Sequence, residues 1–169
     1  MRRLKNIRRK AAALFLCAAL LFLCAGCGAE TPAPRDLLED FSENYENMPA
    51  GQVYFNGAEE WEAEALSPSL ADALFREDNG ENAFSLCKEF AIFLASSHTG
   101  GEIAFLRAAG GEDATRVAEM CAARIARARR TVSGNPILDG ACVLRRGRTV
   151  VLLMMPDNAA AKSICQKIL

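Results

Sequence analysis

The sequence predicts an α+β domain in which a small antiparallel sheet of about four strands, formed by two hairpins, packs against helices. Two observations predict this class. Strand-like apolar runs occur in pairs joined by glycine turns, at 83–97 with 102–109 and again within 141–156. Apolar residues at helical spacing occur before, between and after these pairs. Strands that follow one another as hairpins are antiparallel, so helices are expected to cover the sheet.

The first helix is predicted within 34–48, where proline stands just ahead of an amphipathic pattern. Pro49 and Gly51 are expected to end it. The apolar positions are spaced i, i+1, i+4, i+8 and i+11, and they are Leu37, Leu38, Phe41, Tyr45 and Met48.

The segment 50–82 carries weaker signals. Val53 and Phe55 alternate with polar neighbours, which favours a short edge strand. Ser67 and Pro68 are typical of an N-cap and a first-turn proline, so a helix is expected from there to about Phe75. A loop with its turn at Asn79-Gly80 follows.

The second half predicts a long central helix and a terminal one. Asp113 is expected to cap the long helix, and Asp157 the terminal helix at 158–169. Between them, a hairpin turns at Arg146-Gly147, and its second arm, 149–155, is continuously apolar, as in a central strand buried on both faces. One apolar stripe marks each helix: Val117, Cys121, Ile125, Ala128 and Val132 on the first, and Ala161, Ile164, Cys165 and Ile168 on the second.

Residues 1–26 are predicted to be a signal peptide. Six basic residues in the first ten precede 16 uncharged ones, from Ala11 to Gly26. At about 1.5 Å per residue this run spans roughly 24 Å as a helix, which is short of the ~30 Å core of a bilayer. A basic segment followed by a short apolar one is typical of an export signal.

The end of the leader, Ala25-Gly26-Cys27, resembles a bacterial lipobox, although Cys24 stands where that pattern usually has leucine. The resemblance implies cleavage between Gly26 and Cys27 and a diacylglyceryl group on the Cys27 sulfur. Residues 27–35 then form a polar, lipidated tether, and 36–169 form a single domain. We therefore expect a protein anchored by its lipid on the extracytoplasmic face of the cell membrane. The alternative is a leader in which Cys27 is incidental.

Removal of 1–26 changes the charge balance. Six of the 20 basic residues lie there, whereas all 21 acidic residues follow, so 14 basic and 21 acidic residues remain and the net charge is −7. An acidic domain argues against nucleic acid as a partner, because nucleic-acid binding selects basic patches. It also predicts repulsion between the domain and an anionic lipid surface.

Four cysteines follow Cys27, namely Cys87, Cys121, Cys142 and Cys165, and each lies in an apolar-patterned element. In an exported chain they can form two disulfides or remain as buried thiols, and the patterning favours thiols. After Cys27 the chain has a single histidine, His98, and no Cys-x-x-Cys. No cofactor, metal or redox site is predicted.

The lipobox leader is followed by three segments in order: GGEIAFLRA, an Ala/Arg-rich helix and VLRRGRTVVLLMMPD. In this combination, over about 80–169, the chain resembles a family of small lipoproteins from Gram-positive anaerobes that is catalogued only as a domain of unknown function. The positions that carry the resemblance are Glu102-Ile103, Arg124, Gly147 and Asp157. It implies the fold and the location, and no activity.

Three sets of residues were weighed for chemistry. Ser96-Ser97-His98 contains the only serine beside histidine, but neighbours on a turn rarely align for catalysis, and no acid partner is evident. Four carboxylates lie beside Trp61, at Glu59, Glu60, Glu62 and Glu64. They could bind a cation or a glycan, or they could form a solvent-exposed acidic face. The arginines between 124 and 130 could bind an anionic wall polymer. Alternatively, they form a solvated helix face with ion pairs to nearby acidic residues.

These readings leave two classes of function. The first is a non-catalytic interaction or accessory module of the cell envelope, with an envelope protein or cell-wall component as partner. The second is a small-ligand or solute-binding lipoprotein, or an enzyme with an unorthodox site. Since 143 residues remain after the leader, there is room for one lobe, whereas solute receptors normally use two. The sequence therefore favours the accessory module and predicts no catalytic residue.

Overall fold

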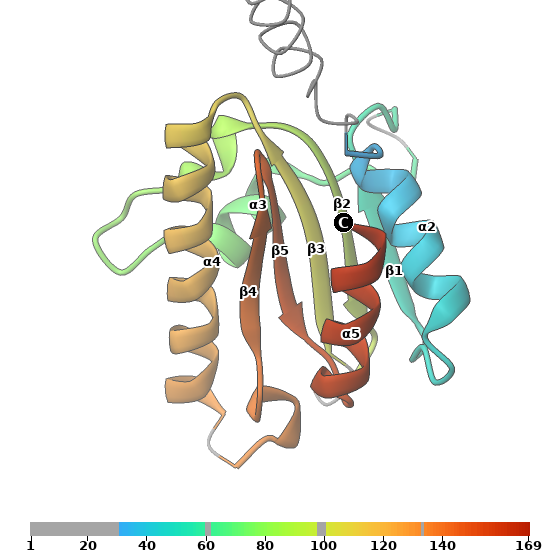
Figure 1. The fold of residues 1–169 in the computed structure, drawn as a ribbon. Coiled ribbons are helices and arrows are strands. Elements are labelled where there is room, and N and C mark those ends of the chain that lie inside the picture. Colours follow the sequence, from blue (N-terminus) through green and yellow to red (C-terminus); the bar gives the residue numbers. More distant parts are fainter. Residues whose placement is uncertain (1–30, 60–61, 98–100, 133) are drawn as a thin grey trace, which may run out of the picture. The chain divides into compact units, whose positions relative to one another are not determined.

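A five-stranded antiparallel sheet lies at the centre of the molecule, with helices on both faces (Figure 1). The computed structural model describes residues 31–59, 62–97, 101–132 and 134–169. The strand order is β1-β2-β3-β5-β4, and each neighbouring pair is antiparallel. The predicted α+β class is confirmed, and the short edge strand expected at Val53 and Phe55 is the fifth member of the sheet. The strands are β1 (Gly51–Phe55), β2 (Cys87–Ala95), β3 (Glu102–Ala108), β4 (Cys142–Arg146) and β5 (Thr149–Met154).

Each face of the sheet is covered by two helices. Helices α3 (Pro68–Phe75) and α4 (Gly111–Thr131) cover one face, and α2 (Pro34–Asn44) and α5 (Asn158–Ile168) cover the other. The apolar stripes predicted for α4 and α5 pack on the sheet, except that the last predicted position, Val132, follows the end of α4 and is exposed. Two hydrophobic clusters result, one on each side of the strands.

The three inner strands, β2, β3 and β5, contribute side chains to both clusters. Ala104 and Leu106 face α4, while Ile103 and Phe105 face α2 and α5. Every residue of β5 is buried, as the continuously apolar arm 149–155 predicted. Because a strand covered on both faces needs no polar side, its sequence loses the alternation of a surface strand.

The strand predicted for 83–97 is shorter than expected. Residues Ala83–Leu86 form a 3-10 helix, η1, and the strand begins only at Cys87. The reason is local: the side chain of Asn82 accepts a hydrogen bond from the Phe84 amide at 3.0 Å, which caps a helical turn. Phe84 then stacks on Phe75 of α3 with ring centroids 4.9 Å apart. Alternation of apolar residues alone did not distinguish this turn from a strand.

Two helix boundaries also differ from the prediction. Helix α2 begins at Pro34 and ends at Asn44, earlier than the apolar pattern through Met48 indicated. Tyr45 caps it, and the Tyr45 hydroxyl accepts a hydrogen bond from the Asp157 amide at 2.9 Å. Helix α4 is capped by Gly110, and Asp113 lies in its first turn, where a carboxylate favours the helix dipole.

Other predicted boundaries are confirmed. The Ser67 side chain accepts from the Leu70 amide at the start of α3, and Asp157 accepts from the Ala160 amide at the start of α5. The compact unit extends from Thr31 to Leu169, so its first residues fall inside the range 27–35 expected as tether. The predicted signal peptide and Cys27 lie outside the described residues. Within the described residues, no helix is both long and apolar enough to cross a bilayer.

Gly101, just before β3, occupies a position that tolerates no side chain. Its φ is +99°, and a Cβ there would lie 2.4 Å from the Met154 carbonyl oxygen. Gly57 has a similar φ of +94°, but a Cβ there meets nothing within 4 Å. The two glycines therefore share the backbone strain and differ in the steric collision.

We predict that Gly101→Ala lowers the free energy of unfolding well beyond the effect of Gly57→Ala. The shared positive φ costs about 1–3 kcal/mol in either variant, and the backbone collision at Gly101 adds a further ~1–3 kcal/mol. Urea unfolding of both variants measures the difference. Equal losses at the two positions would contradict the close approach of Gly101 to the end of β5.

Candidate functional site

A charged pair, Glu102 and Arg124, lies between the sheet and α4. Glu102 is the first residue of β3, and its side chain is only 6% exposed. An Nη2 atom of Arg124, from the middle of α4, lies 2.8 Å from Glu102 Oε2. Both positions belong to the pattern behind the family resemblance, and the structure brings these two into direct contact.

Burial dominates the electrostatics of this pair. Desolvation raises the pKa of Glu102 above its ordinary value of 4.5, although the Arg124 guanidinium pulls it in the opposite direction. Desolvation, together with the neighbouring Arg124 charge, also lowers the pKa of Arg127. Among the described residues, neither Glu102 Oε1 nor Arg124 Nε has a hydrogen-bond partner, although both atoms are buried. The pair thus retains one unused acceptor and one unused donor.

A cleft of about 270 Å³ adjoins Arg124. Val132, at the end of α4, is 44% exposed beside it. The lining mixes polar and apolar surface from the ends of β2, β5 and α4, from η2 (Pro136–Leu138) and from residues beside them: Ala95, Ser97, Gly101, Ala128, Asn135, Ile137, Leu138 and Met154, besides Arg124 and Val132. Ser97, which the sequence suggested as a nucleophile, lies at this cleft, whereas His98 is outside the described residues.

The arrangement supports two chemical roles. An ion pair between β3 and α4 clamps the helix to the sheet, and its geometry with a 2.8 Å contact suits that role. A neutral group with one donor and one acceptor, such as a carboxamide, also matches the two unused atoms. Nothing in the pair resembles a nucleophile activated by a base, because Glu102 and Arg124 already neutralise each other.

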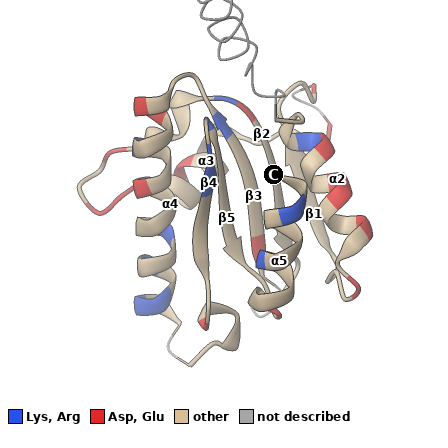
Figure 2. Ribbon diagram, viewed as in Figure 1, with Lys and Arg blue, Asp and Glu red and all other residues tan. Residues whose placement is uncertain are grey.

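The remaining arginines of the α4 segment 124–130 also bind within the domain. Figure 2 marks the basic residues of this helix in blue. Arg127 donates to the carbonyls of Ala73, Leu74 and Arg76, the last turn of α3, where a helix leaves its carbonyls without partners. Arg129 donates to the carbonyls of Leu138 and Ala141, and Arg130 pairs with Asp78 at 2.6 Å. The ion pairs expected on this helix face are present at Arg124 and Arg130, whereas Arg127 and Arg129 bind backbone carbonyls instead of acids.

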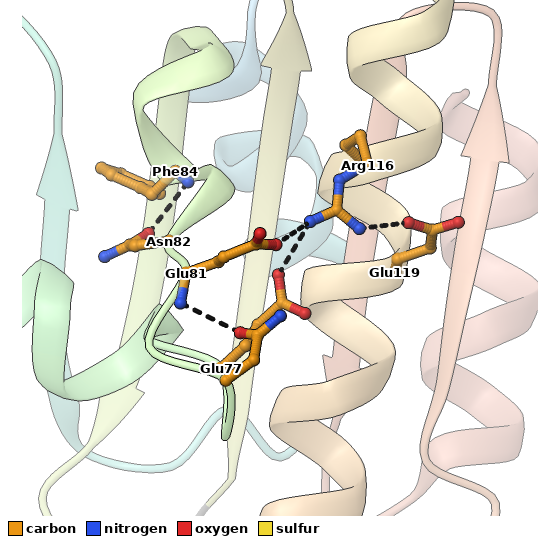
Figure 3. A network of polar contacts seen from close by, with 7 residues as sticks. Glu77, Glu81, Asn82, Phe84, Arg116 and Glu119 are labelled. Atoms are coloured by element: carbon orange, nitrogen blue, oxygen red, sulfur yellow. Dashed lines mark hydrogen bonds and ion pairs between the residues drawn. The ribbon is translucent and has the colours of Figure 1, made fainter.

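A more exposed network surrounds Arg116 near the start of α4 (Figure 3). Its guanidinium contacts Glu119 at 2.5 Å, Glu81 at 2.8 Å and Glu77 at 3.5 Å. The loop that carries Glu77 and Glu81 is thereby drawn onto α4, although the Arg116 side chain is 43% exposed. Exposed pairs of this kind contribute little stability each, so we assign the network to positioning the loop.

All four cysteines after Cys27 are thiols in the structure, as the apolar patterning favoured. Cys121 and Cys165 are buried in α4 and α5. Burial raises the pKa of Cys87 and of Cys165 to about 12, and the pKa of Cys121 is raised as well. A thiol nucleophile must ionise, so these three side chains are suited to packing and not to covalent catalysis.

The acidic segment is only partly described, since Glu60 and Trp61 lie outside the described residues. The Glu62 carboxylate accepts a hydrogen bond from the Glu59 amide at 2.9 Å, which makes a local turn. Glu64 lines a shallow groove between α2 and β1. Within the described residues, no three His, Cys, Asp or Glu side chains gather as a metal site would require.

Comparison with known proteins found no matching family model, no matching curated protein and no matching solved structure.

Arg107 and Arg127 were missed as contact residues by sequence reasoning. The signal for Arg107 is its place in the strand EIAFLRA, where Glu102 and Arg107 bracket a run of apolar residues. A charged residue in a strand that is buried on both faces needs a partner. For Arg127 no local signal exists, because the carbonyls it contacts lie more than 50 positions earlier in the chain.

We predict strong coupling between Glu102 and Arg124 in a double-mutant cycle. Glu102→Leu or Arg124→Met alone leaves a buried charge unpaired and lowers the free energy of unfolding by about 2–4 kcal/mol. The double variant should lose less than either single one, because no charge is then stranded. Arg116→Met, on the same helix but solvent-exposed, is the control and should lose less than either. Additive losses at Glu102 and Arg124 would show that the pair is not coupled.

The pH dependence of stability should differ between the parent and Glu102→Gln. A raised pKa in the folded state means that folding binds a proton once the pH exceeds the ordinary value of 4.5. The contribution of Glu102 to stability is therefore fully present below that value and declines as pH rises toward the folded pKa. Urea titrations from pH 4 upward should show the parent losing stability relative to Glu102→Gln. A constant difference across this range would contradict the assigned direction.

Proposed function

We propose that the chain is a membrane-anchored extracytoplasmic lipoprotein whose domain acts as a non-catalytic interaction or accessory module of the cell envelope. The observation that carries the proposal is the sequence Ala25-Gly26-Cys27 at the junction of the uncharged run and the polar chain. A cysteine at that junction suits lipid transfer to its sulfur. Two acyl chains on one residue meet the requirement of two hydrophobic signals for stable anchoring.

The position at which the domain begins supports this proposal. Thr31 is the first residue of the compact unit and follows Cys27 by four positions. Arg107 of β3 donates to the carbonyls of Thr31 and Pro32, so the entering chain is held at a defined place on the sheet. A lipid on Cys27 would therefore hold the domain close to the membrane, because only a few residues separate the two.

The use of the charged side chains supports a non-catalytic role. Arg124, Arg127, Arg129 and Arg130 each contact a carboxylate or carbonyl of the same domain. Because these arginines are engaged in contacts within the domain, they do not form a pre-arranged set of acid, base and nucleophile. A role in binding a partner through the surface fits this arrangement better. Its partner is proposed to be another envelope component.

A second candidate function is binding of a small neutral ligand in the cleft beside Arg124. Arg124 lines this cleft and keeps its buried Nε without a partner within the described residues, which favours a ligand with an acceptor oxygen. Replacement of Val132 by Trp at the cleft rim tests this candidate. The exposed position tolerates a larger side chain without disturbing the core, and a bound small molecule would be displaced.

Cys27→Ala should abolish lipid attachment and should release the protein from membranes or leave its leader uncut. The reason is that only the Cys27 thiol can form the thioether at the predicted cleavage point. Membrane fractionation and mass spectrometry of the N-terminus measure both effects. Cys24→Ala, three residues earlier, is the matched control and should remain processed and acylated. An N-terminus without acyl mass in the parent would refute the proposal.

A further inference from the structure

The four cysteines after Cys27 divide into two pairs, one on each face of the sheet. Cys87 and Cys121 belong to the hydrophobic cluster beneath α3 and α4, whereas Cys142 and Cys165 belong to the cluster beneath α2 and α5. Because the sheet separates the two clusters, a disulfide from one face to the other is excluded. Of the three pairings that four cysteines allow, only the one that keeps each bridge on a single face remains.

Cys142 and Cys165 lie at nearly the same level on their shared face. Asn158, the first residue of α5, donates to the Asp139 carbonyl at 2.7 Å, and a Cβ on Gly140 would lie 3.3 Å from the Asn158 Cβ. From this contact β4 and α5 run in the same direction along the sheet (Figure 1). The step from Gly140 to Cys142 is about 7 Å of extended chain, and that from Asn158 to Cys165 is about 10 Å of helix, on the same buried side of α5. The two levels therefore differ by less than one helical turn.

Cys87 and Cys121 lie at different levels of the other face. Cys87 is the first residue of β2 and is opposite Ala108, the last residue of β3. Helix α4 begins soon afterwards at Gly111, and Cys121 lies ten residues further on, about 15 Å along the helix axis. A disulfide requires α-carbons about 4.4–6.8 Å apart, so this offset is too large for a bridge.

The two members of the Cys142 pair also differ in accessibility. Cys142 is half-buried, whereas Cys165 is fully buried. Burial, with a smaller contribution from the Cys142 thiol, raises the pKa of Cys165 to about 12. An external oxidant therefore reacts first with Cys142, and Cys165 is placed to complete the bridge.

We propose that Cys142 and Cys165 form a disulfide that ties β4 to α5 once the chain has been exported, while Cys87 and Cys121 remain thiols. The inference rests on the proposed export of the chain, since disulfides persist outside the reducing cytosol. The oxidant is a disulfide of the envelope, either that of a donor protein or a low-molecular-weight one.

The exchange proceeds through a mixed disulfide. Cys142 loses its proton, and its thiolate attacks one donor sulfur and breaks the donor S–S bond. Cys165 then loses its proton and attacks the Cys142 sulfur, which forms the protein S–S bond and releases the second donor sulfur. The donor takes up the two protons and leaves as thiols, so two protein thiols are oxidised and one donor disulfide is reduced.

The test uses the full lipoprotein, expressed with its leader in an exporting bacterium and lysed in denaturant with N-ethylmaleimide. Mass spectrometry of the unreduced tryptic digest should show the Cys142 peptide joined to the Cys165 peptide, and the other two peptides alkylated. Alkylation of all four peptides in acylated protein, or any other linkage, would overturn the proposal. Trypsin cuts after lysine and arginine, so each cysteine lies in its own peptide: 77–88, 117–124, 131–145 and 163–167.

A matched pair of variants tests the position of the bridge. Cys142→Ser and Cys87→Ser each replace a half-buried thiol at the first residue of a strand. Addition of dithiothreitol should lower the Tm of the parent and of Cys87→Ser by about 10 °C, because reduction frees the unfolded chain. The Tm of Cys142→Ser should not respond to dithiothreitol. The same response in both variants would contradict a bridge at Cys142.

Export and bridging fail in distinguishable ways. A chain that keeps its leader and carries no acyl mass refutes the proposed anchor. The same full chain, refolded from urea in a glutathione redox buffer, then tests the bridge independently of export. Oxidation of Cys142 with Cys165 in that buffer supports the pairing, whereas persistence of both as thiols overturns it.

Discussion

Burial of the inner strands on both faces is the constraint on which this structure depends. Side chains of β3 and β5 fill two separate clusters, so the sheet requires a pair of helices on each side. A one-layer cover would leave half of those apolar side chains in water, at a cost of about 1.5–3 kcal/mol for each large one. Helices α2 and α4 pack directly on the strands, whereas α3 packs mainly on α4 and η1, and α5 packs on both α2 and β5.

Charged residues within such a structure must be neutralised where they stand. Glu102 and Arg107 occur near the two ends of β3, and each is neutralised differently. Glu102 pairs with Arg124 and thereby fixes α4, whereas Arg107 pairs with Glu89 and also binds the entering chain. The strand that forms the core thus also sets the position of one helix and of the N-terminal connection, which links packing to the proposed anchoring.

The arginines illustrate why functional inference from sequence was limited. A row of arginines on α4 resembles a binding surface for an anionic polymer. Arg127, however, satisfies the terminal carbonyls of α3, and Arg129 those of the segment 138–141. An arginine with five donors is well suited to such backbone carbonyls, and the partners are invisible to local pattern because they are distant in the chain.

The sequence alone determined the class of fold, the central position of 149–155 and the caps at Ser67 and Asp157, because these follow from local periodicity and local hydrogen bonds. Tertiary structure decided the pairing of Glu102 with Arg124 and the contact of Arg107 with Thr31. These features join residues from separate elements, and their free energy arises only when packing removes water from between them. The same distinction applies to charge: composition gives the total, whereas the fold decides which charges face a partner.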